Sequence, residues 1–234
     1  KRFIFSSSCA VYDRGMMAED VIQDEEAAVA PRAAYATSKY AAERALLALA
    51  DKDFQPTILR QGTVYGWSPR MRYDLVVNTF VRCAFESGRL TVHCGGEMWR
   101  PLVDVTDVAK CYLACIQADL KDVGGQIFNL AYKNFRILEL AHWVKKALDG
   151  IVPVEIEVEY GSSTARDYRV STKKLERILG FRPRVSVEES ARHMARKIQA
   201  GIHADFHNPR YYNIQWLELL VEIEQHLKRL GSIF

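Results

Sequence analysis

The first thirteen residues, KRFIFSSSCAVYD (1–13), place a short apolar strand directly before a run of small hydroxyl side chains. Residues 2–6 have the composition of a buried strand, which leads into Ser6, Ser7 and Ser8. A serine hydroxyl at a strand end can share the proton path of a neighbouring acid or base and hold a substrate oxygen. The stretch therefore indicates a candidate chemical site and sets the question for the rest of the chain.

The composition is that of an ordinary soluble protein. The chain has 234 residues, 49% hydrophobic and 26% charged, which is enough for one or two domains with a sizeable core. Its net charge of +3 is too small to argue for a nucleic-acid partner. No stretch approaches ~18 uninterrupted apolar residues, so we expect no membrane span. Five cysteines without a CxxC pair, and histidines without ligand spacing, argue against a metal site and favour the reducing cytoplasm.

Apolar strands alternate with amphipathic helices along the whole chain, which predicts an α/β fold with parallel strands. The expected strands are 2–6, 56–60, 90–94, 101–105, 125–131 and 152–160. The expected helices are 35–50, 74–87, 107–118, 136–148, 171–181, 186–201 and 213–230. Thr106 and Asp107 are expected to cap the helix 107–118.

The segment YATSK (35–39) carries an acid/base pattern. Tyr35 and Lys39 are four residues apart, so a helix places both side chains on one face. A free phenol has a pKa of about 10 and is a poor base at neutral pH, whereas a nearby ammonium favours the phenolate and lowers that pKa. Such a pair can move a proton on and off an alcohol while a hydride leaves its carbon. Taken alone, the pair is most simply a surface pair.

Four ordered segments change this interpretation, because together they resemble the extended short-chain dehydrogenase/reductases, the branch with the sugar-nucleotide epimerases and dehydratases. The segments are SSSCAVY (6–12), PRAAYATSKYAAE (31–43), ILRQGTVYG (58–66) and WRPLVDVTDVA (99–109). The resemblance runs from the fifth strand of that family's Rossmann sheet to its C-terminus. It implies the C-terminal part of a doubly wound parallel sheet with a smaller α/β substrate-binding domain.

The resemblance also implies a division of the chain. Residues 1–66 would be the remaining part of the NAD(P)-binding Rossmann domain, with the catalytic groups. Residues 67–234 would form mainly the substrate-binding domain, with segments near 102–132 returning to the Rossmann sheet.

By the same resemblance, Tyr35 matches the catalytic tyrosine, and Lys39 matches the lysine that tunes it and holds the nicotinamide ribose. Ser8, four residues before Tyr12, matches the catalytic Ser/Thr. Ser6 and Ser7 would line the strand end near an NAD or NADP cofactor. Hydroxyls that satisfy the backbone at a strand terminus are an equally good interpretation of these two serines.

The implied substrate is a nucleotide-diphosphate sugar. Asn78 and Arg100 match family residues that contact the diphosphate, and Arg166 matches a second arginine there. Two guanidiniums suit a diphosphate because each can donate two parallel hydrogen bonds. Thr91 and His93 fall where the family lays the base along a strand. The alternatives are an ion pair of Arg100 with Asp104 or Asp107, and a packed core role for His93.

The two residues after the catalytic hydroxyl separate reactions within the family. Dehydratases carry Asp-Glu there, whereas this chain has Cys9 and Ala10. Elimination of water therefore lacks its acid/base pair, and Cys9 is most simply a small buried residue. Ser8, Tyr35 and Lys39 suffice for a 4-epimerase or a 4-ketoreductase. The alternatives are a dehydratase that uses other groups and a non-catalytic member of the fold that binds a nucleotide or a protein.

None of the 13 glycines forms the G-x-G-x-x-G turn that binds a dinucleotide pyrophosphate. In the family this turn lies before the strand 2–6, so we expect the chain alone to bind a dinucleotide poorly. A longer protein, a partner chain with the missing half, and a remnant without activity are the three explanations. The resemblance also implies a homodimer through a bundle that includes the helix 35–50, where Ala41, Ala42, Ala45 and Ala48 permit close approach.

Overall fold

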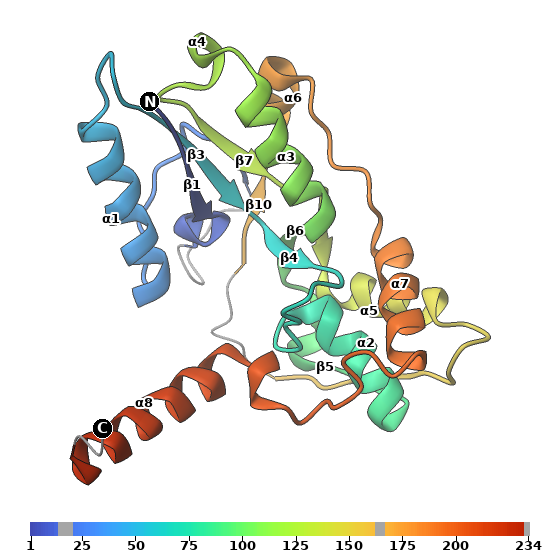
Figure 1. The fold of residues 1–234 in the computed structure, drawn as a ribbon. Helices are drawn as coiled ribbons and strands as arrows, with labels where there is room; N and C mark the ends of the chain where they lie inside the picture. Colours follow the sequence, from blue (N-terminus) through green and yellow to red (C-terminus); the bar gives the residue numbers. More distant parts are fainter. Residues whose placement is uncertain (14–20, 162–166, 232–234) are drawn as a thin grey trace.

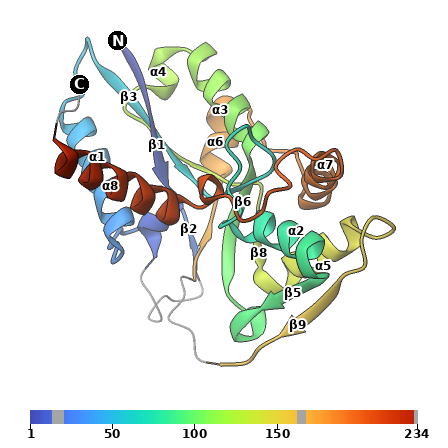
Figure 2. The ribbon, with the colours of Figure 1, turned by 60° about the horizontal axis from the view of Figure 1, so that its bottom comes forward.

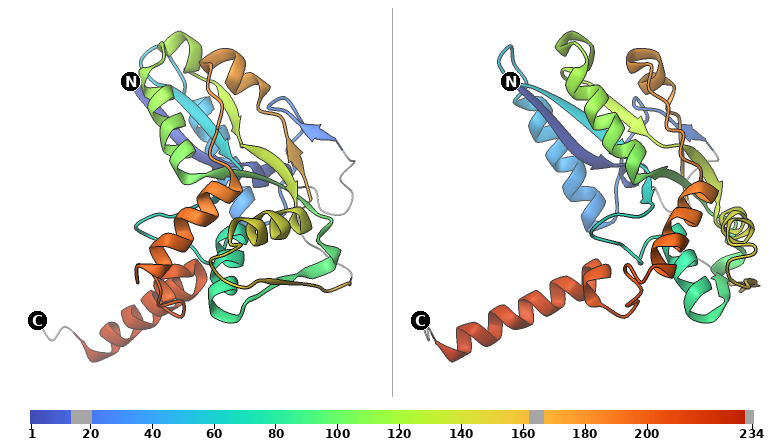
Figure 3. Two further views of the ribbon diagram at one scale, coloured as in Figure 1. Left: turned by 90° about the vertical axis from the view of Figure 1, so that its right-hand side faces the viewer. Right: turned by 45° about the vertical axis from the view of Figure 1, so that its right-hand side comes forward.

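The structure is a computed structural model that describes residues 1–13, 21–161 and 167–231. Its first layer is a parallel sheet of β1 (Arg2–Ser8), β3 (Gln55–Gln61) and β7 (Ile127–Leu130) in the order β1-β3-β7. The helix α1 (Ala34–Ala48) connects β1 to β3 on one face, and α3 (Val105–Gln117) lies on the other (Figures 1 and 3). Helices on both faces are what a parallel sheet needs, because its apolar strands are then buried on both sides. The predicted α/β class with parallel strands is confirmed.

The other strands form three short groups. β4 (Thr63–Tyr65) pairs in parallel with β6 (Trp99–Asp104), and β6 pairs antiparallel with β8 (Lys133–Arg136). The remaining groups are the parallel pairs of β5 (Arg89–Val92) with β9 (Glu155–Val158) and of β2 (Ile22–Gln23) with β10 (Arg169–Val170). The short strands β2, β4, β8 and β10 were not expected from the sequence; β2 and β10 have two residues each, which is too few to show a hydrophobic period.

The largest hydrophobic core is built mainly by three helices: α2 (Val76–Ser87), α5 (Ile137–Ala147) and α7 (Val187–Gln199). α2 and α5 lie beside β5 and β9 in the lower half of Figure 2, and α7 packs against α2 and α5. A second core joins α3, β7 and α6 (Lys173–Leu179), and includes Cys111 and Cys115 as fully buried residues. The chain continues through the short helix η4 (Pro209–Tyr211) into α8 (Asn213–Leu230), and a further short helix, α4 (Leu120–Val123), precedes β7.

The predicted cap of α3 is wrong in its residues. The helix begins at Val105, and its N-cap is Asp104, whose side chain accepts a hydrogen bond of 2.7 Å from the Thr106 backbone N–H. Asp107 is buried and instead accepts from the backbone N–H groups of Arg184 and Val185, at 2.6 and 2.7 Å. Asp107 therefore fastens the segment before α7 to α3 rather than starting the helix.

No helix in the described part of the chain combines the length and the apolar composition that crossing a membrane requires.

The turn after β5 gives a test of close packing. Gly96 has a φ of +70°, and a Cβ there would lie 2.5 Å from Val92 Cγ1 and 2.7 Å from Leu138 Cβ. Gly125 also has a φ of +70°, but a Cβ there would meet nothing within 4 Å. We expect Gly125→Ala to cost about 1–2 kcal/mol of left-handed backbone strain. Gly96→Ala should cost about 1–3 kcal/mol more from overpacking.

Urea denaturation of the two variants measures this difference directly. Because the two glycines share the same φ, equal losses of stability would contradict the packing at Gly96.

Candidate functional site

Tyr35 and Lys39 lie together at the carboxyl end of β1. Tyr35 is in the first turn of α1 and its side chain is 53% exposed. The Lys39 Nζ is 5.8 Å from the centre of the Tyr35 ring and donates a 2.8 Å hydrogen bond to the Ser6 carbonyl oxygen. The same ammonium lies 5.1 Å from the centre of the Phe5 ring. A phenol that solvent can reach therefore has a fixed cation beside it, at the sheet edge where ligands bind in α/β proteins.

The three serines have three different environments. Ser8 is half-buried at the N-cap of the short helix η1 (Cys9–Tyr12), and its hydroxyl accepts a 3.2 Å hydrogen bond from the Ala10 N–H. The Ser6 hydroxyl accepts a 2.9 Å hydrogen bond from Gln61 Nε2. Ser7 is buried, and its hydroxyl donates to the Glu43 carboxylate. Ser8 thus shares its strand end with Lys39 and Tyr35, although among the described residues no hydrogen bond joins it to Tyr35.

Beneath this site lies a buried ion pair that the sequence reasoning missed. Glu43 and Arg60 are both buried. Arg60 Nη2 is 2.7 Å from Glu43 Oε2, and Arg60 Nε is 3.0 Å from Glu43 Oε1. Arg60 Nη1 donates to the Tyr12 hydroxyl at 2.7 Å, and that hydroxyl donates to Asn129 Oδ1 at 2.8 Å. One guanidinium therefore holds α1, η1 and β3 together. The available signal was an arginine within the apolar strand 55–61, because a buried charge needs a partner.

Cys9 and Ala10 are both buried, Cys9 completely. The Cys9 thiol donates to the Arg60 carbonyl oxygen at 3.0 Å, and burial raises the pKa of this thiol far above its usual range. A thiol in this state stays protonated and cannot act as a nucleophile or base. The interpretation of Cys9 as a packing residue agrees with its surroundings.

The Asn78 side chain, which the family resemblance assigns to the substrate diphosphate, is hydrogen-bonded within the fold. It is buried in α2, where its Oδ1 accepts from the Gly66 N–H at 2.9 Å and its Nδ2 donates to the Arg72 carbonyl oxygen at 2.9 Å. The amide thus anchors the loop between β4 and α2. A contact of Asn78 with a substrate diphosphate stays a prediction.

Arg100 is in β6 and has a guanidinium 6.0 Å from the centre of the Tyr168 ring, with Nη1 donating to the Trp99 carbonyl oxygen at 2.7 Å. Thr91 is in β5. His93, in the short helix η3 (His93–Gly96), is 69% exposed, with Nδ1 2.7 Å from a Glu159 carboxylate oxygen, so it is not a core histidine. Arg166 lies outside the described residues. The ligand contacts proposed for these residues stay predictions.

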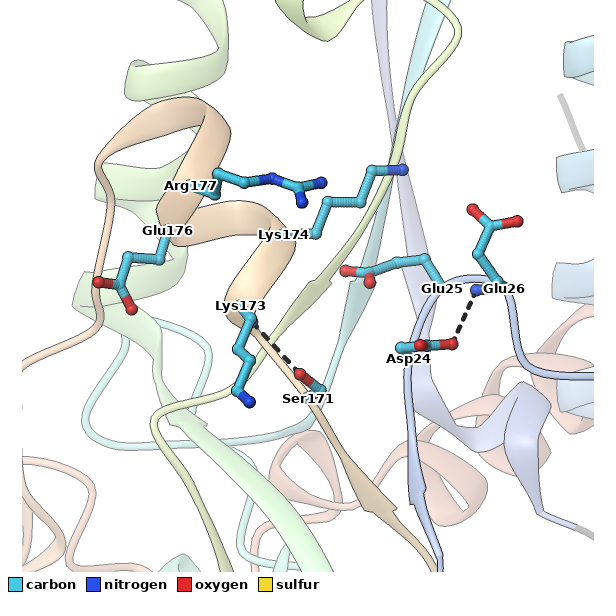
Figure 4. A pocket seen from close by; sticks show the side chains of 8 residues that line it. All are labelled: Asp24, Glu25, Glu26, Ser171, Lys173, Lys174, Glu176 and Arg177. Carbon is cyan, nitrogen blue, oxygen red and sulfur yellow. Dashed lines mark hydrogen bonds between the residues drawn. The ribbon is translucent and has the colours of Figure 1, made fainter.

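A cavity of about 600 Å³ opens on the other side of the buried polar groups (Figure 4). It is lined by Asp24, Glu25, Glu26, Ser171, Lys173, Lys174, Glu176 and Arg177. The Lys174 and Arg177 side chains of α6 project toward the loop that carries Glu25 and Glu26 (Figure 4). The cavity contains none of the predicted site residues. Glu25 links the cavity to the buried polar groups, because its carboxylate accepts a 2.7 Å hydrogen bond from the Asn129 N–H.

Comparison with known proteins assigns the fold and the family. The family model described as the NAD dependent epimerase/dehydratase family matches residues 1–131, and the chain belongs to this family. Among solved structures, RMD from Pseudomonas aeruginosa complexed with NADPH gives a TM-score of 0.71 at 23% identity, over 86% of this chain and 67% of that one. UDP-glucose 4-epimerase from Thermotoga maritima with UDP-glucose also gives 0.71, at 22% identity, over 86% and 64%.

A dTDP-glucose 4,6-dehydratase from Bacillus anthracis in complex with NAD gives a TM-score of 0.70 at 19% identity, over 92% of this chain and 64% of that one. At these identities the likeness shows the fold alone, a Rossmann-type α/β fold with parallel strands, which confirms the predicted fold class. The chain spans about two thirds of the length of these structures.

The buried ion pair predicts an unusual mutational pattern. Arg60→Met leaves the Glu43 carboxylate buried without its cation, and Glu43→Leu does the reverse, so each should cost about 3–5 kcal/mol of unfolding free energy. The double variant Glu43→Leu/Arg60→Met buries no charge and should lose much less than the sum of the two. Chemical denaturation of the four proteins forms a double-mutant cycle.

Glu157→Gln is the matched control, since its partner Arg89 is 3.4 Å away and both side chains are largely exposed. It should cost less than about 1 kcal/mol. Additive losses in the cycle would contradict a coupled pair.

Glu25 predicts a pH dependence of stability. Burial raises the pKa of Glu25, more than the Asn129 N–H and the Lys174 charge lower it. A raised pKa in the folded state gives a stability contribution that is present at acid pH and lost as pH rises through that pKa. Glu25→Gln removes the titration and keeps an acceptor for Asn129. Its free energy of unfolding relative to the wild type should therefore increase from acid to neutral pH.

Denaturation at several pH values measures this difference. The exposed Glu26→Gln is the matched control and should stay within about 0.5 kcal/mol of the wild type. If the difference in unfolding free energy between Glu25→Gln and the wild type is constant or falls with pH, burial does not disfavour the ionised form of Glu25.

Proposed function

We propose that the protein is an NAD(P)-dependent sugar-nucleotide 4-epimerase or 4-ketoreductase, with Tyr35 as acid/base, Lys39 beside it and Ser8 as the second hydroxyl. The observation that carries this proposal is the position of the Lys39 ammonium, which bonds the Ser6 carbonyl oxygen at the end of β1 and lies 5.8 Å from the Tyr35 ring centre. Membership of the NAD dependent epimerase/dehydratase family and the similarity to proteins bound to NAD, NADPH or UDP-glucose support it.

The residues present fit the nicotinamide end of a dinucleotide. The Lys39 ammonium and the exposed Ser6 lie at the carboxyl end of β1, where a ribose hydroxyl would find both a cation and hydrogen-bonding groups. NAD(P), when bound, takes up and returns a hydride at the sugar carbon. The sequence contains no glycine-rich turn for the pyrophosphate, so residues 1–66 supply only the catalytic part of that binding domain in this proposal.

Tyr35 would exchange a proton with the sugar 4-hydroxyl, because its phenol is exposed and the Lys39 ammonium lies beside it. Ser8 would donate to or accept from the same sugar oxygen. In an epimerase the hydride returns to the opposite face of carbon 4 and the proton returns to the oxygen on that carbon, whereas a ketoreductase only delivers a hydride to the carbon and a proton to the oxygen of a 4-keto group.

Dehydration is disfavoured by the two residues after Ser8. Elimination of water needs an acid and a base placed beside the sugar, but Cys9 and Ala10 are buried and Cys9 keeps its proton.

In this proposal residues 67–234 mainly bind the nucleotide sugar, through Asn78, Arg100 and the other predicted contacts. Segments near 102–132 return to the sheet. We also expect a homodimer through the outer face of α1, where Ala41, Ala45 and Ala48 are exposed.

Activity on nucleotide sugars tests the proposal. We expect the full-length protein with NAD(P) to convert a UDP-, GDP-, CDP- or dTDP-hexose at carbon 4, with the product identified by NMR. Tyr35→Phe should lower kcat by about 10²–10⁴-fold, because it removes the proton-transfer group. Consumption of one NAD(P)H for each product indicates a reductase, and conversion without net consumption indicates an epimerase.

Tyr40→Phe is the matched control on the same helix and should retain activity, because Tyr40 is half-buried in a small apolar core. A 4-keto-6-deoxy product would contradict the assignment to epimerisation or reduction. Absence of conversion and binding, with Tyr35→Phe unchanged from the wild type, would exclude this function.

A further inference from the structure

The helix α8 leaves the body of the protein with an uncovered apolar surface. Its first residue is fixed by Arg70 Nη2, which donates to Asn213 Oδ1 at 3.1 Å, and by Asp74, which accepts from the Asn213 N–H at 3.4 Å. Beyond this the helix projects outward (Figures 1 and 3). Every residue from Leu220 to Leu230 is exposed. Large exposed apolar patches mark interaction surfaces, and most of the stability of a helix in a protein comes from packing of its apolar face.

The apolar residues follow a coiled-coil period. Trp216, Leu220, Ile223, Leu227 and Leu230 are separated by four, three, four and three residues, the spacing that aligns a stripe along one side of a helix. Leu227 and Leu230 are 62% and 60% exposed, and Ile223 is 45% exposed. In the described part of the chain Leu220, Ile223, Leu227 and Leu230 of this stripe are exposed, so the stripe can pack against a second helix with the same period.

The charges specify the direction of that second helix. Glu218, Glu222 and Glu224 occupy the first part of α8, and Lys228 and Arg229 occupy the end. A parallel pair of these helices would place like charges together, whereas an antiparallel pair places the acidic part of each beside the basic part of the other. The sequence of α8 is therefore complementary to itself in the antiparallel direction.

We propose that α8 pairs antiparallel with α8 of a second copy of this chain, with the stripe from Trp216 to Leu230 as the buried seam. In the register that opposes Ile223 to Leu227 of the other copy, Glu224 and Lys228 flank the seam on one side. Within one chain these two already form a 2.7 Å ion pair. Across the seam each Glu224 comes within reach of Lys228 of the other copy, so the two lysines offset the charges of the two Glu224 carboxylates, which also approach each other in this register.

The assembly does not depend on the proposed sugar-nucleotide chemistry, because the stripe contains none of the predicted site residues. Since α8 points away from the body, an antiparallel pair holds the two bodies at opposite ends of the seam (Figure 3). This interface is separate from the α1 bundle, and either one could raise the mass of the wild type. The experiment therefore compares the wild type with variants that change α8 alone.

Sedimentation equilibrium of the full chain over a wide range of concentration tests the pairing. We expect the weight-average mass of the wild type to rise with concentration and to approach twice that of Ile223→Glu or Leu227→Glu. Without other contacts, this is a change from twice 26.7 kDa to 26.7 kDa. Circular dichroism should show loss of helix signal in both variants, because the unpaired helix loses the packing of its apolar face.

A charge exchange tests the register. Glu224→Lys and Lys228→Glu should each lower the mass by up to twofold, since each places like charges across the seam, and an equal mixture of the two should restore the wild-type mass. Glu218→Lys changes the charge equally on the opposite side of the helix, and should behave as the wild type. An unchanged mass in the Ile223 and Leu227 variants would overturn the pairing, and failure of the mixture would overturn its antiparallel register.

Discussion

The ion pair between Glu43 and Arg60 is the interaction on which the candidate site depends. Glu43 comes from α1, two turns after Tyr35, and Arg60 comes from β3, the strand beside β1. A buried charge is tolerated only with its partner in place, so the pair permits one position of α1 on the sheet. That position carries the Tyr35 and Lys39 side chains to the carboxyl end of β1, where Ser8 begins η1.

The same polar groups extend away from the site toward the opposite side of the sheet. The hydroxyl of Tyr12 accepts from Arg60 and donates to Asn129, and the Asn129 backbone donates to Glu25 at the wall of the charged cavity. Every polar atom named here has a partner, which keeps burial of so many groups tolerable. The network joins β7 and the loop before β2 to the elements that carry the candidate site, so a change at its far end acts on their packing.

Local patterns predicted much of the fold, because long elements repeat their period often enough to be recognised. The helices near 35–50, 74–87 and 186–201 are present with ends that shift by two residues or fewer. Short strands such as β2 and β10 were missed, since two residues form a strand only through the partner that tertiary structure brings to them. The same reason explains the wrong cap of α3: Asp107 is drawn from its helix end to the backbone at Arg184, seventy-seven residues away.

The sequence by itself determined the α/β class, the family resemblance and the Tyr35–Lys39 pair, because a four-residue helical spacing fixes two side chains on one face whatever lies around them. Only the tertiary structure decided which groups surround that pair. Glu43, Arg60 and Tyr12 are far apart or on different elements in the sequence, and their burial together depends on the parallel register of β1 and β3. Burial in turn decides the chemistry, since it removes Cys9 from acid/base work while Tyr35 remains in contact with solvent.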